Sequence, residues 1–236
     1  MAKTPIWKSI RSSIEQEISD GIYGPGEKLP TEQELTQRFG VNRHTIRHAL
    51  AALADDGIVR SRRGSGVFVA SQLTSYPIGK RVRFHQNIAK TGRLPQKTVL
   101  RLETRKAGYD ERTKLGLPAY AQVHVYEGLS LANDEALGLF CSVFPADRFA
   151  ALPAAIEQDT SVTNALRACG VSDYTRVETL ITAERASPTQ ALHLGIREGD
   201  PVLKTTSVNA DAEGTPIEFG TTFFVADKVT LTIQPN

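Results

Sequence analysis

Isoleucine recurs at every fourth position near the start of the chain: Ile6, Ile10, Ile14 and Ile18. This spacing places the apolar side chains along one face of a helix, while charged residues take the other faces. The pattern predicts an amphipathic helix that ends at the glycine- and proline-rich stretch 21–26.

The next apolar positions predict two short helices separated by a tight turn. Thr31 can cap the first of them, and Glu34, three residues further on, completes a capping box. Gly40 makes the break, and Asn42 can cap the helix that follows and ends near Gly57. The apolar positions of that helix are Ile46, Ala49, Leu50 and Leu53. Two helices joined by a glycine-containing turn are typical of a helix-turn-helix.

A β-hairpin is predicted next. Two β-prone stretches, 58–63 and 67–69, flank the triplet Gly64-Ser65-Gly66, which suits a tight turn. A helix, a helix-turn-helix and a hairpin in this order predict a winged helix-turn-helix domain over residues 1–70.

The pattern changes after an uncharged, turn-rich stretch, residues 71–79, which we expect to be a linker. Beyond it the chain alternates between apolar and polar residues or forms β-rich runs. The predicted strands are 99–105, 123–131, 177–184, 202–208, 219–225 and 229–233, and the predicted helices are 85–90, 162–168 and 188–195. Strands with segregated helices predict an α+β domain around an antiparallel sheet over residues 80–236.

Length and composition agree with two globular domains. The chain has 236 residues, of which 40% are hydrophobic, enough to bury a core. No stretch is long and apolar enough for a membrane span, and the first residues lack a signal-peptide core, so we expect a cytoplasmic protein. Cys141 and Cys169 are too few for a disulfide framework or a zinc site, and we expect neither a metal nor a cofactor.

Positive charge is concentrated in the N-terminal third. The formal net charge is only +2, which is small for a nucleic-acid-binding protein, so the placement of the charges matters more than their sum. Six arginines lie between Arg38 and Arg63, against only Asp55 and Asp56. The alternative is a small helical domain whose arginines merely face water, because arginine is common on any surface.

The third predicted helix presents polar and basic side chains in its first turns: Arg43, His44, Thr45 and Arg47. This is the part of a recognition helix that meets base edges in the major groove. Arg43 can donate two hydrogen bonds to a guanine, and Arg47, one turn further on, can hold a phosphate or a second base.

The hairpin would add contacts to the DNA backbone. Arg62 and Arg63 precede its tip and would meet phosphates, and the Gly-Ser-Gly tip carries little side chain to obstruct an approach to the minor groove.

Four segments of this region resemble the GntR family of bacterial repressors: Leu29–Leu35, Phe39–Leu50, Gly57–Val59 and Gly64–Val69. The resemblance implies operator contacts by Arg43, Arg47 and Gly66. Gln33 stands where many members carry arginine, so we expect a different operator sequence, although glutamine can still bind adenine or touch a phosphate. The full set of predicted DNA-binding residues is Thr31, Gln33, Asn42, Arg43, His44, Thr45, Arg47, Arg62, Arg63, Ser65 and Gly66.

Residues 80–236 resemble the UTRA-type effector domain of the HutC branch of this family, which shares its fold with chorismate lyase. Four segments are most similar to the phosphonate-utilisation (PhnF-type) regulators of that branch: Val41–Thr45, Tyr76–Pro77, Arg83–Asn87 and Glu178–Ala183. The resemblance implies a homodimeric transcription factor, most simply a repressor, that binds double-stranded operator DNA and a small-molecule effector. Two copies on a pseudo-palindrome would add their binding energies.

An anion site is predicted where the helix near residue 85 begins. Its backbone N–H groups, with Arg83, His85 and Asn87, would cradle phosphate or phosphonate oxygens. The alternative is that Arg83 pairs with a carboxylate and Asn87 caps a turn. Strand residues are candidates to bind a ligand amine or hydroxyl, or are ordinary sheet residues. The candidate effector residues are Arg83, Phe84, His85, Asn87, Glu178, Thr182 and Glu218.

Three departures from relatives bear on the effector. Sugar-phosphate-sensing relatives carry a pair of arginines where this chain has Gly128 and Ser130, and many relatives carry arginine in place of Val225. Their loss argues against a sugar phosphate held in the same way. The sequence does not choose the identity of the effector among a phosphonate, another small anion such as a urocanate-like acid, and a neutral compound.

Two other functions are alternatives. One is a lyase-like enzyme, which the lack of a recognisable catalytic motif argues against. The other is an architectural DNA-binding protein without a ligand.

Overall fold

The computed structural model describes residues 5–62, 64–70, 73–81 and 83–233, and the chain divides into two compact units between residues 72 and 73. Each unit has a hydrophobic core of its own. No helix within these described ranges is long and apolar enough to cross a membrane.

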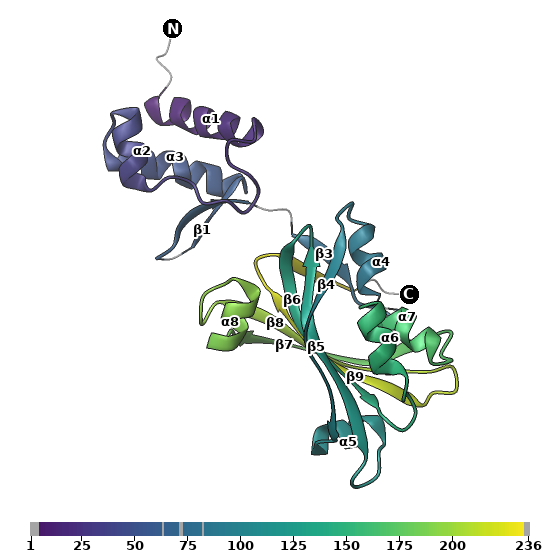
Figure 1. The fold of residues 1–236 in the computed structure, drawn as a ribbon. Helices are drawn as coiled ribbons and strands as arrows, with labels where there is room; N and C mark the ends of the chain where they lie inside the picture. The colour runs from purple at the N-terminus through teal and green to yellow at the C-terminus, as the bar shows by residue number, and fades with distance from the viewer. Residues whose placement is uncertain (1–4, 63, 71–72, 82, 234–236) are drawn as a thin grey trace. The chain divides into compact units, whose positions relative to one another are not determined.

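The N-terminal unit is a winged helix-turn-helix, as the sequence predicts (Figure 1). Ile10 and Ile14 are buried in its core, whereas Ile6 is 63% exposed. The elements are α1 (Ile6–Ser19), α2 (Glu32–Phe39), α3 (Arg43–Asp55), β1 (Val59–Arg62) and β2 (Gly66–Val69).

Both predicted caps of the helix-turn-helix are present. Thr31 Oγ1 accepts a hydrogen bond from Glu34 N at 3.3 Å, and the Glu34 carboxylate accepts one from Thr31 N at 2.7 Å. Asn42 Oδ1 accepts from Thr45 N at 2.9 Å. Gly40, which ends α2, has a φ of 63°, a conformation that glycine adopts without strain. These local interactions determine where α3 begins.

The C-terminal unit is an α+β domain built on a six-stranded antiparallel sheet with the order β4-β5-β6-β9-β8-β7. Its strands are β4 (Pro95–Lys106), β5 (Gln122–Ala132), β6 (Glu135–Pro145), β7 (Thr175–Arg185), β8 (Pro201–Ala210) and β9 (Pro216–Val225). A separate parallel pair joins β3 (Thr74–Pro77) to β10 (Val229–Thr232).

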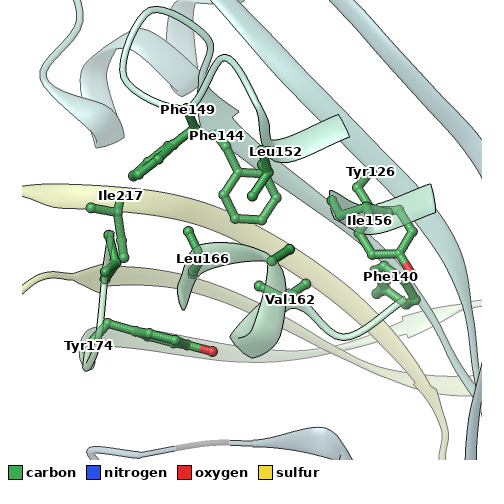
Figure 2. Packing of buried hydrophobic residues seen from close by; sticks show 12 residues of the cluster. Tyr126, Phe140, Phe144, Phe149, Leu152, Ile156, Val162, Leu166, Tyr174 and Ile217 are labelled. Carbon is green, nitrogen blue, oxygen red and sulfur yellow. The ribbon is translucent and has the colours of Figure 1, made fainter. Parts of the chain in front are cut away.

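Helices lie on both sides of the large sheet. Tyr126 and Phe140 pack with α6 and α7 on one face (Figure 2). Leu139 packs with α8 on the other face, because successive residues of a strand point to opposite sides. The helices of this unit are α4 (Phe84–Ala89), α5 (Tyr109–Leu115), α6 (Leu152–Gln158), α7 (Val162–Ala168) and α8 (Pro188–Leu194).

Several elements differ from the sequence-based predictions. The stretch 71–79, expected to be a linker, contains β3, in which buried Thr74 and Tyr76 alternate with exposed Ser75 and Pro77. The central strand β6 was not predicted, since it is buried on both faces and shows no alternation. The sequence pattern also does not predict α5 and α6, because their N-cap residues, Gly108 and Ala151, lack the side-chain capping signal that Ser161 and Ser187 give for α7 and α8.

Candidate nucleic-acid interface and ligand cavity

The first turns of α3 present two exposed guanidinium groups. The side chains of Arg43 and Arg47 are 66% and 69% exposed. They lie four residues apart and therefore on the same side of the helix. The Glu32 carboxylate lies 3.6 Å from Arg43 Nε and 3.8 Å from Arg47 Nε. This carboxylate gathers both guanidiniums over one surface, but an exposed pair of this kind is weak, and both arginines stay available to a polyanion.

The capping residues lie at the same surface and stabilise the starts of the two helices. Asn42 Oδ1 accepts from both the backbone N–H and the hydroxyl of Thr45, each at 2.9 Å. The Thr31 hydroxyl belongs to the capping box. Gln33 and His44 are exposed and accessible from solvent. The cap residues thus determine where α3 begins, while the exposed side chains around them are accessible to DNA.

The tip of the hairpin is built from small residues. Ser65 is buried, and Gly66 is exposed with a φ of 114°, which disfavours any other residue. Arg62 is opposite Gly66 in the β1–β2 register, and Arg63 lies outside the described residues.

Lys28 is a basic residue of the wing that the sequence pattern did not reveal. A Cβ at Gly66 would lie 2.8 Å from Lys28 Cε, so the lysine stem runs against the hairpin tip. Its backbone also forms an isolated bridge with Phe68. Lys28 precedes the helix-turn-helix in sequence by several residues, and only the folded hairpin brings its charge to the wing.

The C-terminal unit contains a cavity of about 440 Å³. Strand residues from β4, β5, β6, β7, β8 and β9 line it, as do residues of α4 and α7. Its sheet residues belong to the face that carries Phe140. The lining mixes basic, acidic, hydroxyl and aromatic side chains, which suits a small polar ligand.

Four of the seven predicted effector residues line this cavity: Arg83, Phe84, His85 and Glu218. Asn87 does not line it; it is buried and donates a hydrogen bond to the Pro77 carbonyl at 3.4 Å. Glu178 and Thr182, on β7, are also outside the lining, and Glu178 forms an ion pair with Lys114. The structure therefore brings together Arg83, Phe84, His85 and Glu218, and leaves Asn87 and the two β7 candidates outside the lining.

Arg83 is firmly held in the cavity wall. Its guanidinium lies 3.6 Å from the centre of the Tyr174 ring, and Nη2 donates to the Tyr174 carbonyl at 2.9 Å. The same nitrogen is 3.2 Å from an Asp173 carboxylate oxygen. The carboxylate pairing considered from the sequence is thus present, and it takes up part of the capacity of Arg83 to bind an anion.

Lys97 is the main cavity residue that the sequence did not indicate. Its Nζ lies 4.3 Å from the centre of the Phe140 ring and 5.4 Å from that of Tyr126. Burial lowers the pKa of Lys97 to about 8. Burial also lowers the pKa of His85, and the nearby Lys97 charge adds to that effect. The strand pattern around residue 99 gave no signal that this lysine would point into a cavity.

Glu218 is held by hydrogen bonds inside the cavity. It is 8% exposed, and its carboxylate accepts from Ser142 Oγ at 2.7 Å and from Asn209 Nδ2 at 2.6 Å. These partners come from β6 and β8, the two strands that flank β9. Buried acids of this kind are stable when hydrogen-bonded, and the arrangement leaves the carboxylate able to accept from a ligand.

The positions that hold arginine in sugar-phosphate-sensing relatives lie beside Lys97. Ser130 is directly opposite Lys97 in the β4–β5 register and lines the cavity. At Gly128, a Cβ would lie 2.3 Å from the Thr98 carbonyl oxygen and 3.0 Å from the Phe140 ring. No side chain fits at Gly128 without a shift of the β4 backbone, so an arginine there is incompatible with this sheet geometry.

No cluster of three metal-ligating side chains occurs among the described residues. Cys141 and Cys169 are free and half-buried. Burial raises the pKa of Cys141 to about 11, so its thiol is protonated at neutral pH.

A winged helix-turn-helix with exposed arginines, joined to an α+β domain with a polar cavity, defines a two-domain transcription regulator that binds DNA. Residues 7–69 match the family model for bacterial regulatory proteins of the gntR family, and residues 90–230 match the model for the UTRA domain. The chain belongs to the GntR family, in its HutC group of regulators with a UTRA domain. The family and the fold class expected from the sequence are confirmed.

Relatives along the full chain are transcription regulators. The chain is 38% identical over 230 residues to the uncharacterized HTH-type transcriptional regulator RB1450 of Rhizobium meliloti, covering 97% of this chain and 94% of the relative. It is 32% identical, with the same coverage, to the probable transcriptional regulator PhnF of Escherichia coli. The crystal structure of PhnF from Mycobacterium smegmatis has the same fold, with a TM-score of 0.69 at 24% identity over 96% of this chain and 99% of that one.

Proposed function

We propose that the protein is a cytoplasmic homodimeric repressor whose affinity for its operator is set by a small molecule in the C-terminal cavity. The observation that carries the DNA-binding part is the pair of exposed guanidiniums of Arg43 and Arg47 at the start of α3. A ligand controls such a protein when it binds one conformation more tightly than the other.

Phosphonates are the first effector class to test. The 32% identity to PhnF supports this class, as does the ammonium of Lys97 at the cavity wall. The steric block at Gly128 argues against a sugar phosphate bound through an arginine on β5. Another small anion remains the second candidate, since Lys97 would attract any acidic group.

Dimerisation through the C-terminal sheet is supported by its outer strand. β7 is an edge strand, and Val177, Leu180 and Ile181 on it are 60%, 53% and 42% exposed. An unpaired edge with large apolar side chains favours pairing with another chain. A second copy would cover this edge and bring two recognition helices to one pseudo-palindromic site.

The experiment has two stages. Selection from random duplexes with the full chain should yield an operator with two related half-sites, which is then used in gel-shift titrations at several salt concentrations. A thermal-shift screen with phosphonates, phosphate, sugar phosphates and urocanate should find compounds that raise the melting temperature. Each such compound should also change operator affinity, because linkage is reciprocal.

The results of these experiments distinguish the proposed regulator from an architectural DNA-binding protein and from an enzyme. Failure to select any sequence would contradict the regulator proposal. Operator binding without a stabilising compound in a broad library would favour the architectural alternative. Turnover of chorismate by the purified protein would support the enzyme alternative, and we expect none.

A further inference from the structure

We propose that the cavity binds a small zwitterion, with its acidic group on Lys97 and its ammonium group on Glu218. This inference rests on the proposed function as a ligand-controlled regulator and names the charge pattern of the ligand. It follows from Lys97 and Glu218, two charged groups of one cavity that have no partner of opposite charge within ion-pair distance among the described residues.

Lys97 is the positive end of the cavity. Among the described residues, its ammonium group has no ion pair and no hydrogen bond, and the carboxylates of Glu218 and Asp159 in the same lining attract it from beyond ion-pair distance. Its close neighbours are the faces of the Phe140 and Tyr126 rings, which attract a cation but cannot accept its three hydrogen bonds. An acidic group of a ligand would supply both the missing charge and the missing acceptors.

Each arginine of the lining donates at least one hydrogen bond to a protein group. Arg83 interacts with Asp173 and the Tyr174 carbonyl, and Arg176 Nε donates to Asn209 Oδ1 at 3.2 Å. Arg167 Nη1 donates to Asn164 Oδ1 at 3.0 Å. Among the described residues, Lys97 is thus the one lysine or arginine of the lining that makes no hydrogen bond to the protein.

Glu218 is the negative end. Both of its hydrogen-bond donors, Ser142 and Asn209, are neutral, and no cation lies within ion-pair distance of it in the described part of the chain. A buried carboxylate without a cation gains most from a partner that brings a positive charge. A Cβ at Gly220 would lie 3.8 Å from Glu218 Oε1 and 3.4 Å from Ser207 Oγ, so glycine at this position leaves space beside the carboxylate.

The separation of the two ends suits a short molecule. Lys97 is stacked on Phe140, and Glu218 is held by Ser142, two residues further along β6 on the same face. The two β6 residues that contact these groups are separated by ~7 Å along the strand. We therefore expect a ligand that carries its acidic and ammonium groups a few bonds apart, with one hydrogen bond at each end.

The test compares two phosphonates of nearly equal shape by isothermal titration of the full chain. In 2-aminoethylphosphonate an ammonium group occupies the position of the methyl group of propylphosphonate. We expect the amino compound to bind the unmodified protein at least about tenfold more tightly, since it alone forms the charge-assisted contact with Glu218. β-Alanine tests whether a carboxylate can take the place of the phosphonate on Lys97.

Two variants test which residue binds the acidic group of the ligand and which binds its ammonium group. Glu218→Gln should reduce the preference for the amino compound to less than about threefold, while Lys97→Met should weaken both phosphonates at least about tenfold. The controls are Glu198→Gln and Lys106→Met, which change the same residue types at exposed positions outside the cavity lining. Operator affinity without ligand should be unchanged in the two control variants, and circular dichroism should show that the two cavity variants are folded.

Several results would contradict the proposal that the cavity binds a zwitterion. These are equal binding of the two phosphonates, an unchanged preference in Glu218→Gln, and no binding of any probe by a protein that still binds its operator. If the amino compound binds as expected but does not alter operator affinity, the cavity inference stands and the proposed regulatory role fails.

Discussion

At the scale of single residues, the charges of the cavity and those of the recognition helix differ in their surroundings. Arg43 and Arg47 are exposed and share one acidic neighbour, so their charges cost the fold little. Lys97 is half-buried and Glu218 is buried, and neither has an ion pair among the described residues, an arrangement that disfavours the folded state unless a ligand supplies the partners. Such residues are typical of binding sites, which often trade stability for function.

Replacing Lys97 by Met should stabilise the protein without ligand by about 1–3 kcal/mol at pH 7, because it removes a desolvated charge. The folded lysine has a pKa of about 8, against an ordinary value of 10.5. Between these values the unfolded chain binds more protons, so the stability of the unmodified protein rises with pH and the advantage of the variant shrinks. Glu218 and Asp159 partly offset the cost of the charge, and His85 adds to it.

Urea unfolding at pH 7 and at pH 10 measures this difference. Lys106→Met on the exposed part of β4 is the control and should show no such dependence. A Lys97→Met variant that is less stable than the unmodified protein at pH 7 would contradict the claim that this charge is unpaired.

Replacing Arg43 by Ala should cost about 1–3 kcal/mol of operator binding and relax the base preference at one position of each half-site. The reason is that an exposed guanidinium at the start of α3 can donate two hydrogen bonds to a guanine edge. Gel shifts on operator and scrambled duplexes measure the change, with the exposed Arg197, which follows α8, as the control position. Equal losses on both duplexes would mean that Arg43 contacts phosphate and not bases.

At the scale of elements, short-range hydrogen bonds determine the geometry of the helix-turn-helix. The capping box of α2 and the Asn42 cap of α3 lie on either side of the turn at Gly40. They satisfy backbone N–H groups that the helices cannot pair internally. The large sheet depends instead on strands that are distant in sequence, such as β6 and β9.

Replacing Asn42 by Ala should lower the stability of the N-terminal unit by about 1 kcal/mol, because Thr45 loses the side-chain acceptor of its backbone N–H. Thermal unfolding followed by circular dichroism checks this. Gln37→Ala, at an exposed position inside α2, is the control. A shift no larger than that of the control would show that the cap contributes nothing measurable.

At the scale of the whole molecule, two copies are needed for the proposed mode of operator binding. One winged helix-turn-helix makes few base contacts, and a dimer raises affinity because the second half-site is bound within the same complex. The exposed edge strand β7 is the surface on which we place the second copy.

Replacing Leu180 by Lys should shift the protein from dimer to monomer, because a buried charge at a sheet edge opposes pairing. Analytical ultracentrifugation measures the mass, and operator affinity should fall at least about tenfold. Leu192→Lys, at an 80% exposed position on α8, is the control for added charge. A Leu180→Lys dimer as stable as that of the unmodified protein would place the interface elsewhere.

Features that depend on neighbours in sequence were predictable. Periodic isoleucines, the Thr31 capping box and the Gly-Ser-Gly hairpin tip each act within a few residues, and the winged helix-turn-helix follows from them. The family resemblance in the same segments supplied the class of protein. Features without a local period could not be predicted from the sequence. An example is β6, which is buried on both sides.

The sequence by itself therefore determined the N-terminal fold and the basic start of α3. Only the tertiary structure decided the composition of the cavity, because its residues come from strands paired across long separations. The register places Lys97 opposite Ser130, and the order of β6, β9 and β8 brings Ser142 and Asn209 to Glu218. A shift of one residue in that register would turn each of these side chains to the other face of the sheet.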